Sequence, residues 1–173
     1  TNNVNTNEAA VTVCRTSTMP GDATKSLGSN LLPLQSNWIQ SLDADGFSVG
    51  THTAVNSSGP GWNYYWVAFK AEAGEMVVGS YTGNGSDNRN ITGVGFQPDY
   101  VIVMAASNQV AVHRSSALPG TLLNGTVTVT TGTLTTDRCY TFTAESSFTN
   151  GIQQIISDGF QVGSHSRVNS NGV

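Results

Sequence analysis

The chain has 173 residues, of which 38% are hydrophobic and only 10% are charged, and its formal net charge is −4. This composition allows one or two small hydrophobic cores and requires a surface made largely of uncharged polar residues such as Thr, Ser, Asn and Gly. The negative charge argues against a nucleic-acid partner, and no apolar run is long enough for insertion into a membrane.

An internal repeat organises the chain. Residues 11–21 return as residues 110–120, and residues 39–50 return as residues 152–163, at offsets of 99 and 113. The difference between the offsets predicts an insertion in the second copy. We therefore expect an N-terminal arm or linker at 1–8, a first module at 9–73 and a second module at 74–173, with an inserted Thr-rich hairpin at about 121–145.

Short alternating runs bounded by Gly, Asn, Asp or Pro predict β-strands. In chain order they are residues 10–13, 47–49, 64–69, 76–81, 100–104, 110–112, 127–129, 139–142 and 160–162. Residues 101–104 are apolar on both faces, which predicts a central strand covered on both sides. The pattern as a whole predicts an all-β fold built of β-sandwich (jelly-roll-like) repeat modules.

Two segments are open to more than one interpretation. Residues 37–42 and their copy, 150–156, fit either one or two turns of helix or a strand. Each precedes an Asp-Gly dipeptide, at Asp45-Gly46 and at Asp158-Gly159, and this dipeptide predicts a hairpin turn because Gly accepts a positive φ.

The modules are expected to be incomplete at both chain ends. An aromatic strand at residues 62–70 follows the first copy, but the second copy reaches residue 173 before its counterpart. The second copy is preceded by residues 75–81 and 91–103, to which the polar residues 1–8 offer no equivalent. We expect either a longer tandem protein or neighbouring subunits that complete each other by strand addition.

Several spaced motifs resemble, in their order, a known module. They are residues 80–85, residues 91–103, Asp-Gly-Phe-x-Val-Gly, Val-Asn-x-x-Gly and Tyr-Tyr-Trp-Val-Ala-Phe-Lys-Ala. They resemble a tandem-repeated β-sandwich module of unknown function seen in phage tail-fibre-like proteins and in large secreted or surface proteins of environmental bacteria. The similarity covers most of residues 9–173. It implies a non-catalytic building block of cell-surface or virion assemblies, and it supplies no active site.

The residues themselves carry no enzyme signature. The sequence lacks a Gly-x-Ser-x-Gly elbow, a phosphate-binding loop, a dinucleotide fingerprint and a zinc-spaced Cys/His cluster. His52 and His165 are repeat equivalents, which indicates a shared structural position, and His113 aligns with Cys14. Residues 84–90 are interpreted as a polar turn in preference to a calcium loop, and a paired-carboxylate hydrolase is the weakest alternative. We expect no catalytic residues, cofactor or metal.

Two groups of residues are candidates for ligand binding or cross-linking. Trp62, Tyr64 and Trp66 share one face of the predicted strand, where they would pack in a core, stack on sugar rings or form an assembly face. Cys14 and Cys139 allow one disulfide, with two buried thiols as the alternative. Glycans could attach at four sequons, Asn56, Asn84, Asn90 and Asn124.

The leading hypothesis is a structural module of an extracellular filament, surface layer or virion fibre. It would assemble by sheet packing and strand complementation with copies of itself or with neighbouring repeats of a longer chain. The alternative is a carbohydrate- or receptor-binding adhesin module, in which the aromatic row and the Thr-rich hairpin contact glycans.

Overall fold

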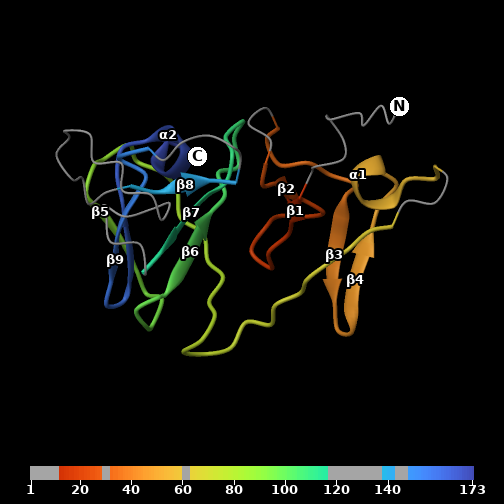
Figure 1. The fold of residues 1–173 in the computed structure, drawn as a ribbon, viewed down its shortest axis with the longest axis horizontal. Helices are drawn as coiled ribbons and strands as arrows, with labels where there is room; N and C mark the ends of the chain where they lie inside the picture. Colours follow the sequence, from red (N-terminus) through yellow and green to blue (C-terminus); the bar gives the residue numbers. More distant parts are fainter. Residues whose placement is uncertain (1–11, 29–31, 60–62, 117–137, 143–147) are drawn as a thin grey trace, which may run out of the picture.

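The computed structural model describes residues 12–28, 32–59, 63–116, 138–142 and 148–173. These residues form short strands and two single-turn helices, which confirms the all-β prediction. All of them except β10 are labelled in Figure 1: β1 (Val13–Cys14), β2 (Lys25–Ser26), β3 (Ile39–Asp43), β4 (Gly46–Val49), α1 (Thr53–Asn56), β5 (Arg89–Thr92), β6 (Tyr100–Val103), β7 (Val112–Ser115), β8 (Tyr140–Thr141), β9 (Ile152–Ile156), β10 (Gly159–Val162) and α2 (Ser166–Asn169).

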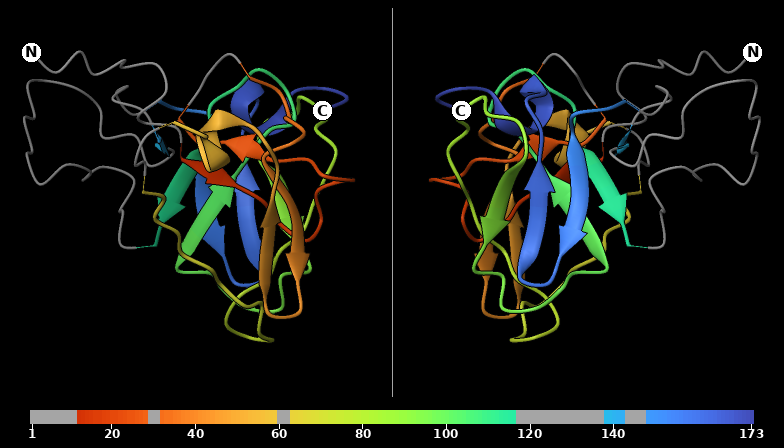
Figure 2. Two further views of the ribbon diagram at one scale, coloured as in Figure 1. Left: turned by 90° about the vertical axis from the view of Figure 1, so that its right-hand side faces the viewer. Right: turned by 90° about the vertical axis from the view of Figure 1, so that its left-hand side faces the viewer.

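The described strands form four small antiparallel sheets. Two of these sheets have two strands, β1-β2 and β3-β4, and two have three strands, β5-β10-β9 and β6-β7-β8. Figure 1 shows β3, β4 and α1 at one end of the long axis and β5 to β10 with α2 at the other. In both views of Figure 2, the hairpins β3-β4 and β9-β10 point their turns toward the same end of the molecule.

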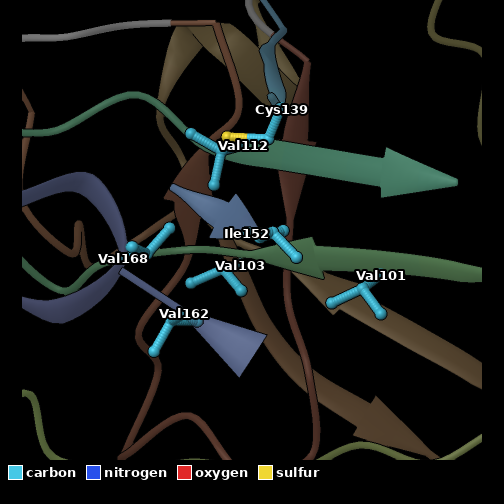
Figure 3. Close-up of a cluster of buried hydrophobic side chains, with 7 residues drawn as sticks. All are labelled: Val101, Val103, Val112, Cys139, Ile152, Val162 and Val168. Atoms are coloured by element: carbon cyan, nitrogen blue, oxygen red, sulfur yellow. The ribbon is translucent and has the colours of Figure 1, made fainter. Parts of the chain in front are cut away.

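Both three-stranded sheets contribute to one hydrophobic core. Its buried members come from β6, β7, β9, β10, α2 and the residue before β8, and Figure 3 shows them as Val101, Val103, Val112, Cys139, Ile152, Val162 and Val168. β-branched residues dominate this cluster. Such side chains pack well on a pleated surface, so the strands that carry them are held together mainly by apolar burial.

The prediction that residues 101–104 form a doubly covered central strand was wrong. Val101 and Val103 are buried, but Tyr100 and Ile102 are 48% and 41% exposed. Among the described residues β6 pairs only with β7 and lies at a sheet edge. Side chains alternate between the two faces of a strand, and only one face of β6 is turned toward the core.

Several strand boundaries also differ from the predictions. Residues 64–69 and 76–81 form no strand, and residue 76 makes only an isolated bridge with Glu72. β7 begins two residues later than expected, residues 37–42 and 150–156 contain strands β3 and β9, and β5 was not predicted. A strand requires a hydrogen-bonded neighbour, which alternation within one segment cannot supply. Residues 10–11 and 127–129 lie outside the described residues.

Cys139 was assigned to the inserted hairpin, but its pairing places it elsewhere. It forms an antiparallel bridge with Phe148, just as Thr24 forms one with Gln35. The strands that follow, β8 and β2, pair with β7 and β1 in the same way. Cys139 therefore corresponds to Thr24, and residues 139–142 continue the repeated pattern. Most of the predicted 121–145 hairpin lies outside the described residues.

Candidate assembly surface

Two hairpin units carry the same residues at matching positions. The first hairpin unit is residues 37–56, with β3, β4 and α1, and the second hairpin unit is residues 150–169, with β9, β10 and α2. The identical pairs used below are Asp45/Asp158, Gly46/Gly159, Phe47/Phe160, Val49/Val162, Gly50/Gly163, His52/His165, Val55/Val168 and Asn56/Asn169.

The backbone that opens each unit has the same conformation. Asn37 and Asn150 both adopt a positive φ, of 67° and 59°, which Asn tolerates better than most residues. A Cβ on Gly50 would overlap the Asn37 carbonyl, and a Cβ on Gly163 would overlap the Asn150 carbonyl. The two units therefore require glycine at the same place for the same steric reason.

The repeated histidines cap the two single-turn helices. His52 Nδ1 accepts a hydrogen bond of 3.1 Å from the Ala54 N–H, and His165 Nδ1 accepts one of 3.2 Å from the Arg167 N–H. Burial, together with the nearby Arg167 charge, lowers the pKa of His165, which favours the neutral ring that this cap requires. Both imidazoles thus hold the backbone in a local turn.

In the second hairpin unit, β10 is covered by residues 81–95, which we call the covering segment. β5 lies within it and pairs antiparallel with β10, with Phe160 opposite Ile91 and Gly159 opposite Thr92. A Cβ on Gly159 would overlap the Ile91 carbonyl, and its φ of 141° also favours glycine. The close approach of the two backbones depends on Gly159.

Asp158 anchors one end of the covering segment. Its carboxylate accepts the Gly93 N–H at 3.1 Å and the Gly95 N–H at 2.6 Å. The hydrogen bonds from Gly95 and Gly93 lower the pKa of Asp158, because they favour the ionised form. Asp158 therefore binds the covering segment in addition to forming the Asp-Gly turn.

Asn169 anchors the other end. It is 1% exposed, and its Oδ1 accepts the Asn84 N–H at 2.9 Å and an Arg89 guanidinium N–H at 3.2 Å. Its Nδ2 donates to the carbonyls of Ser86 and Gly163 at 2.7 and 3.1 Å. All the polar atoms of this buried amide have partners, and three of the four bonds join the covering segment.

Tyr81 fixes the start of the covering segment to α2 and β10. Its hydroxyl donates to the Val168 carbonyl at 2.7 Å, and its ring meets that of Phe160 edge-on at 6.2 Å. Burial raises the pKa of Tyr81, although the guanidinium of Arg89, 5.4 Å from the ring centroid, acts in the opposite direction.

No equivalent cover lies on the first hairpin unit among the described residues. Val49 is 39% exposed, whereas Val162 is 0% exposed. Asn56 donates to the Gly50 carbonyl at 3.0 Å, as Asn169 does to Gly163, but Asn56 Oδ1 and the Asp45 carboxylate accept no hydrogen bond from the described residues. Within the described part of the chain, the first unit thus repeats the anchoring residues of the second without the partners that they have there.

The predicted ligand or assembly face is only partly present. Trp62 lies outside the described residues. Tyr64 is 41% exposed, and its hydroxyl donates to the Thr53 carbonyl at 2.7 Å and accepts the Ser57 N–H at 2.9 Å. Trp66 is 72% exposed and meets Phe47 edge-on at 5.7 Å.

The remainder of this segment is more exposed still. Tyr65, Val67 and Phe69 are 92%, 74% and 73% exposed, and residues 63–70 have no backbone hydrogen bond to the other described residues. We call residues 63–70 the aromatic segment. Among the described residues, this segment therefore combines large exposed apolar side chains with a backbone that has no hydrogen-bonded neighbour.

The two cysteines do not form the disulfide that the sequence allowed. Cys14 is partly buried and Cys139 is fully buried, and both are present as thiols. Burial raises the pKa of the Cys14 thiol, so this side chain is held in its protonated, weakly nucleophilic form.

The sequence analysis missed Lys25, which is completely buried. Its Nζ donates to the Leu32 carbonyl at 2.6 Å and to the Ser107 carbonyl at 2.7 Å, and so joins the β1-β2 region to the loop between β6 and β7. Desolvation lowers its pKa to about 8. The sequence did offer a signal, since Lys25 is one of only two lysines and residues 26–42, which follow it, carry no charge.

In the described part of the chain, the remaining polar side chains do not gather into a metal-binding cluster. Within it, no group of three His, Cys, Asp or Glu side chains could hold a metal ion. The same residues contain no helix with both the length and the hydropathy to cross a bilayer. The polar turn at residues 84–90 is present, with Asn84 Oδ1 accepting the Ser86 N–H at 3.0 Å.

No protein-family model matches the chain, and neither a curated protein nor a solved structure is significantly similar to it.

Proposed function

We propose that the chain is a non-catalytic structural protein built of repeated β-sandwich modules, which assembles through sheet packing and strand complementation. Its partners would be copies of itself or neighbouring repeats of a longer chain. The two three-stranded sheets around one core support the sandwich, and the equivalent hairpin units support the repeat.

The difference in side-chain exposure between Val162 and Val49 is the main support for this proposal. Identical residues in equivalent hairpins are 0% and 39% exposed, because one hairpin has a cover and the other has none among the described residues. An open edge of β4, with apolar side chains beside it, is stabilised by an added strand that supplies both hydrogen bonds and apolar contact.

The proposed location is extracellular, on a cell surface or in a virion. A chain that is rich in Thr, Ser, Asn and Gly and has only 10% charged residues supports it, as do the four sequons. The resemblance to modules of tail-fibre-like and large surface proteins implies the same location.

Self-association tests the assembly role. We expect the full chain to form oligomers whose mass rises with protein concentration, as measured by sedimentation velocity. Val49→Lys would place a charge in the apolar contact beside the open edge of β4 and weaken association, whereas Val49→Ile would preserve that contact. A chain that stays monomeric at all concentrations, with both variants unchanged, would contradict the assembly role.

A second candidate function is supported by the exposure of Tyr65 and Trp66. Exposed aromatic rings stack on sugars, so the aromatic segment would serve a carbohydrate- or receptor-binding adhesin. Such a module should stay monomeric and gain thermal stability when a sugar ligand is added. Tyr65→Ala should abolish that gain without lowering the melting temperature of the sugar-free protein.

A further inference from the structure

We propose that the first hairpin unit is a receptor for the covering segment of another repeat, that is, for a polypeptide with the sequence pattern of residues 81–95. The inference rests on the proposed assembly function and specifies its docking site. The same chain already contains the proposed complex, because its own residues 81–95 are bound to the second hairpin unit.

The receptor groups are identical in the two units. Asp158 holds the N–H groups of Gly93 and Gly95 in the second unit, and Asp45 occupies the same turn position in the first. Asp45 is exposed and makes no hydrogen bond with the described residues. A carboxylate at this position can therefore accept two N–H groups from an incoming chain.

The second anchor is also available. Asn56 repeats the hydrogen bond that orients Asn169, since each side chain donates to the carbonyl of the glycine six residues earlier. That bond leaves Asn56 Oδ1 to accept the backbone N–H that Asn84 provides in the second unit. Because this donor is a backbone N–H, any incoming chain whose backbone follows the path of Asn84 can provide it.

The edge of β4 has the required shape and register. Gly46 repeats Gly159, at which a Cβ would overlap the opposing backbone, and it has the same φ region, 149° against 141°. Antiparallel pairing in the β10 register would place the incoming equivalents of Thr92 and Ile91 opposite Gly46 and Phe47. Among the described residues, the outer edge of β4 has no strand partner.

One contact must change when the segment binds. Trp66 lies edge-on against Phe47 at 5.7 Å, where Tyr81 lies against Phe160 at 6.2 Å in the covered unit. The incoming tyrosine would displace Trp66, which is 72% exposed and therefore has little contact area to lose. Displacement of Trp66 provides an optical signal for binding.

The probe is a synthetic peptide of residues 80–96 added to the full chain. We expect saturable binding by calorimetry, with a change in tryptophan emission that Trp66→Phe reduces. Asp45→Asn should weaken binding about tenfold, because it removes the charge that holds two N–H groups. Glu75→Gln is the control, since it removes one negative charge at an exposed position outside the first hairpin unit.

The outcomes separate this inference from the proposed function. No binding of the peptide, or equal loss in the Asp45 and Glu75 variants, would overturn the receptor even if the chain self-associates. Binding that depends on Asp45 in a chain that stays monomeric would support the receptor and refute assembly of this chain alone. Circular dichroism of each variant should show an unchanged fold, because Asp45 is an exposed turn residue. A scrambled peptide should not bind in any of these cases.

Discussion

Gly151 lies directly against Cys139, so that a Cβ at residue 151 would overlap the thiol sulfur and crowd the ring of Phe148. The Gly151→Ala variant should therefore lose about 1–3 kcal/mol in free energy of unfolding, the usual cost of overpacking a buried site. Chemical denaturation measures the loss. Gly79→Ala is the control, because a Cβ there meets nothing within 4 Å, and it should leave stability nearly unchanged.

The two repeated valines should respond differently to the same truncation. Val162→Ala removes buried methyl groups from the core and should cost about 1–3 kcal/mol in unfolding free energy. Val49→Ala, at a position that is 39% exposed, should cost less than about 0.5 kcal/mol in the monomer. Equal losses in dilute solution would mean that the first unit is covered in the monomer.

The hydrogen bonds of Asp158 predict a loss of stability in acid. Its folded-state pKa lies below the ordinary value of 3.8, so its contribution is present above that value and disappears as the pH falls through the folded-state pKa. Asp158→Asn should flatten the dependence of unfolding free energy on pH below about 4.

Lys25 predicts a stability change at alkaline pH. Desolvation lowers its pKa from 10.5 to about 8, so the unfolded chain binds the proton more tightly and folding becomes more favourable as the pH rises from 8 to 10.5. The unfolding free energy of the natural chain, relative to that of Lys25→Met, should rise by about 1–3 kcal/mol across that interval. Lys70→Met, at an exposed position, is the control. A constant difference across the interval would contradict the assigned burial.

The sequence by itself determined the repeated local structure. The two Asp-Gly dipeptides fixed both hairpin turns, and the repeat placed His52 and His165 at one shared position. These features depend on backbone conformations and hydrogen bonds within a few residues, for which residue type is a sufficient guide. The all-β fold class followed from the same local patterns.

Only the tertiary structure decided which equivalent residues are buried. Val49 and Val162 occupy the same position in the repeated Asp-Gly-Phe-x-Val-Gly motif, so the motif does not distinguish them. Their exposures differ because residues 81–95, about 70 positions from β10 along the chain, cover one hairpin and not the other. The edge position of β6 and the burial of Lys25 likewise arise from contacts between distant segments, which the alternation of side chains along one strand does not encode.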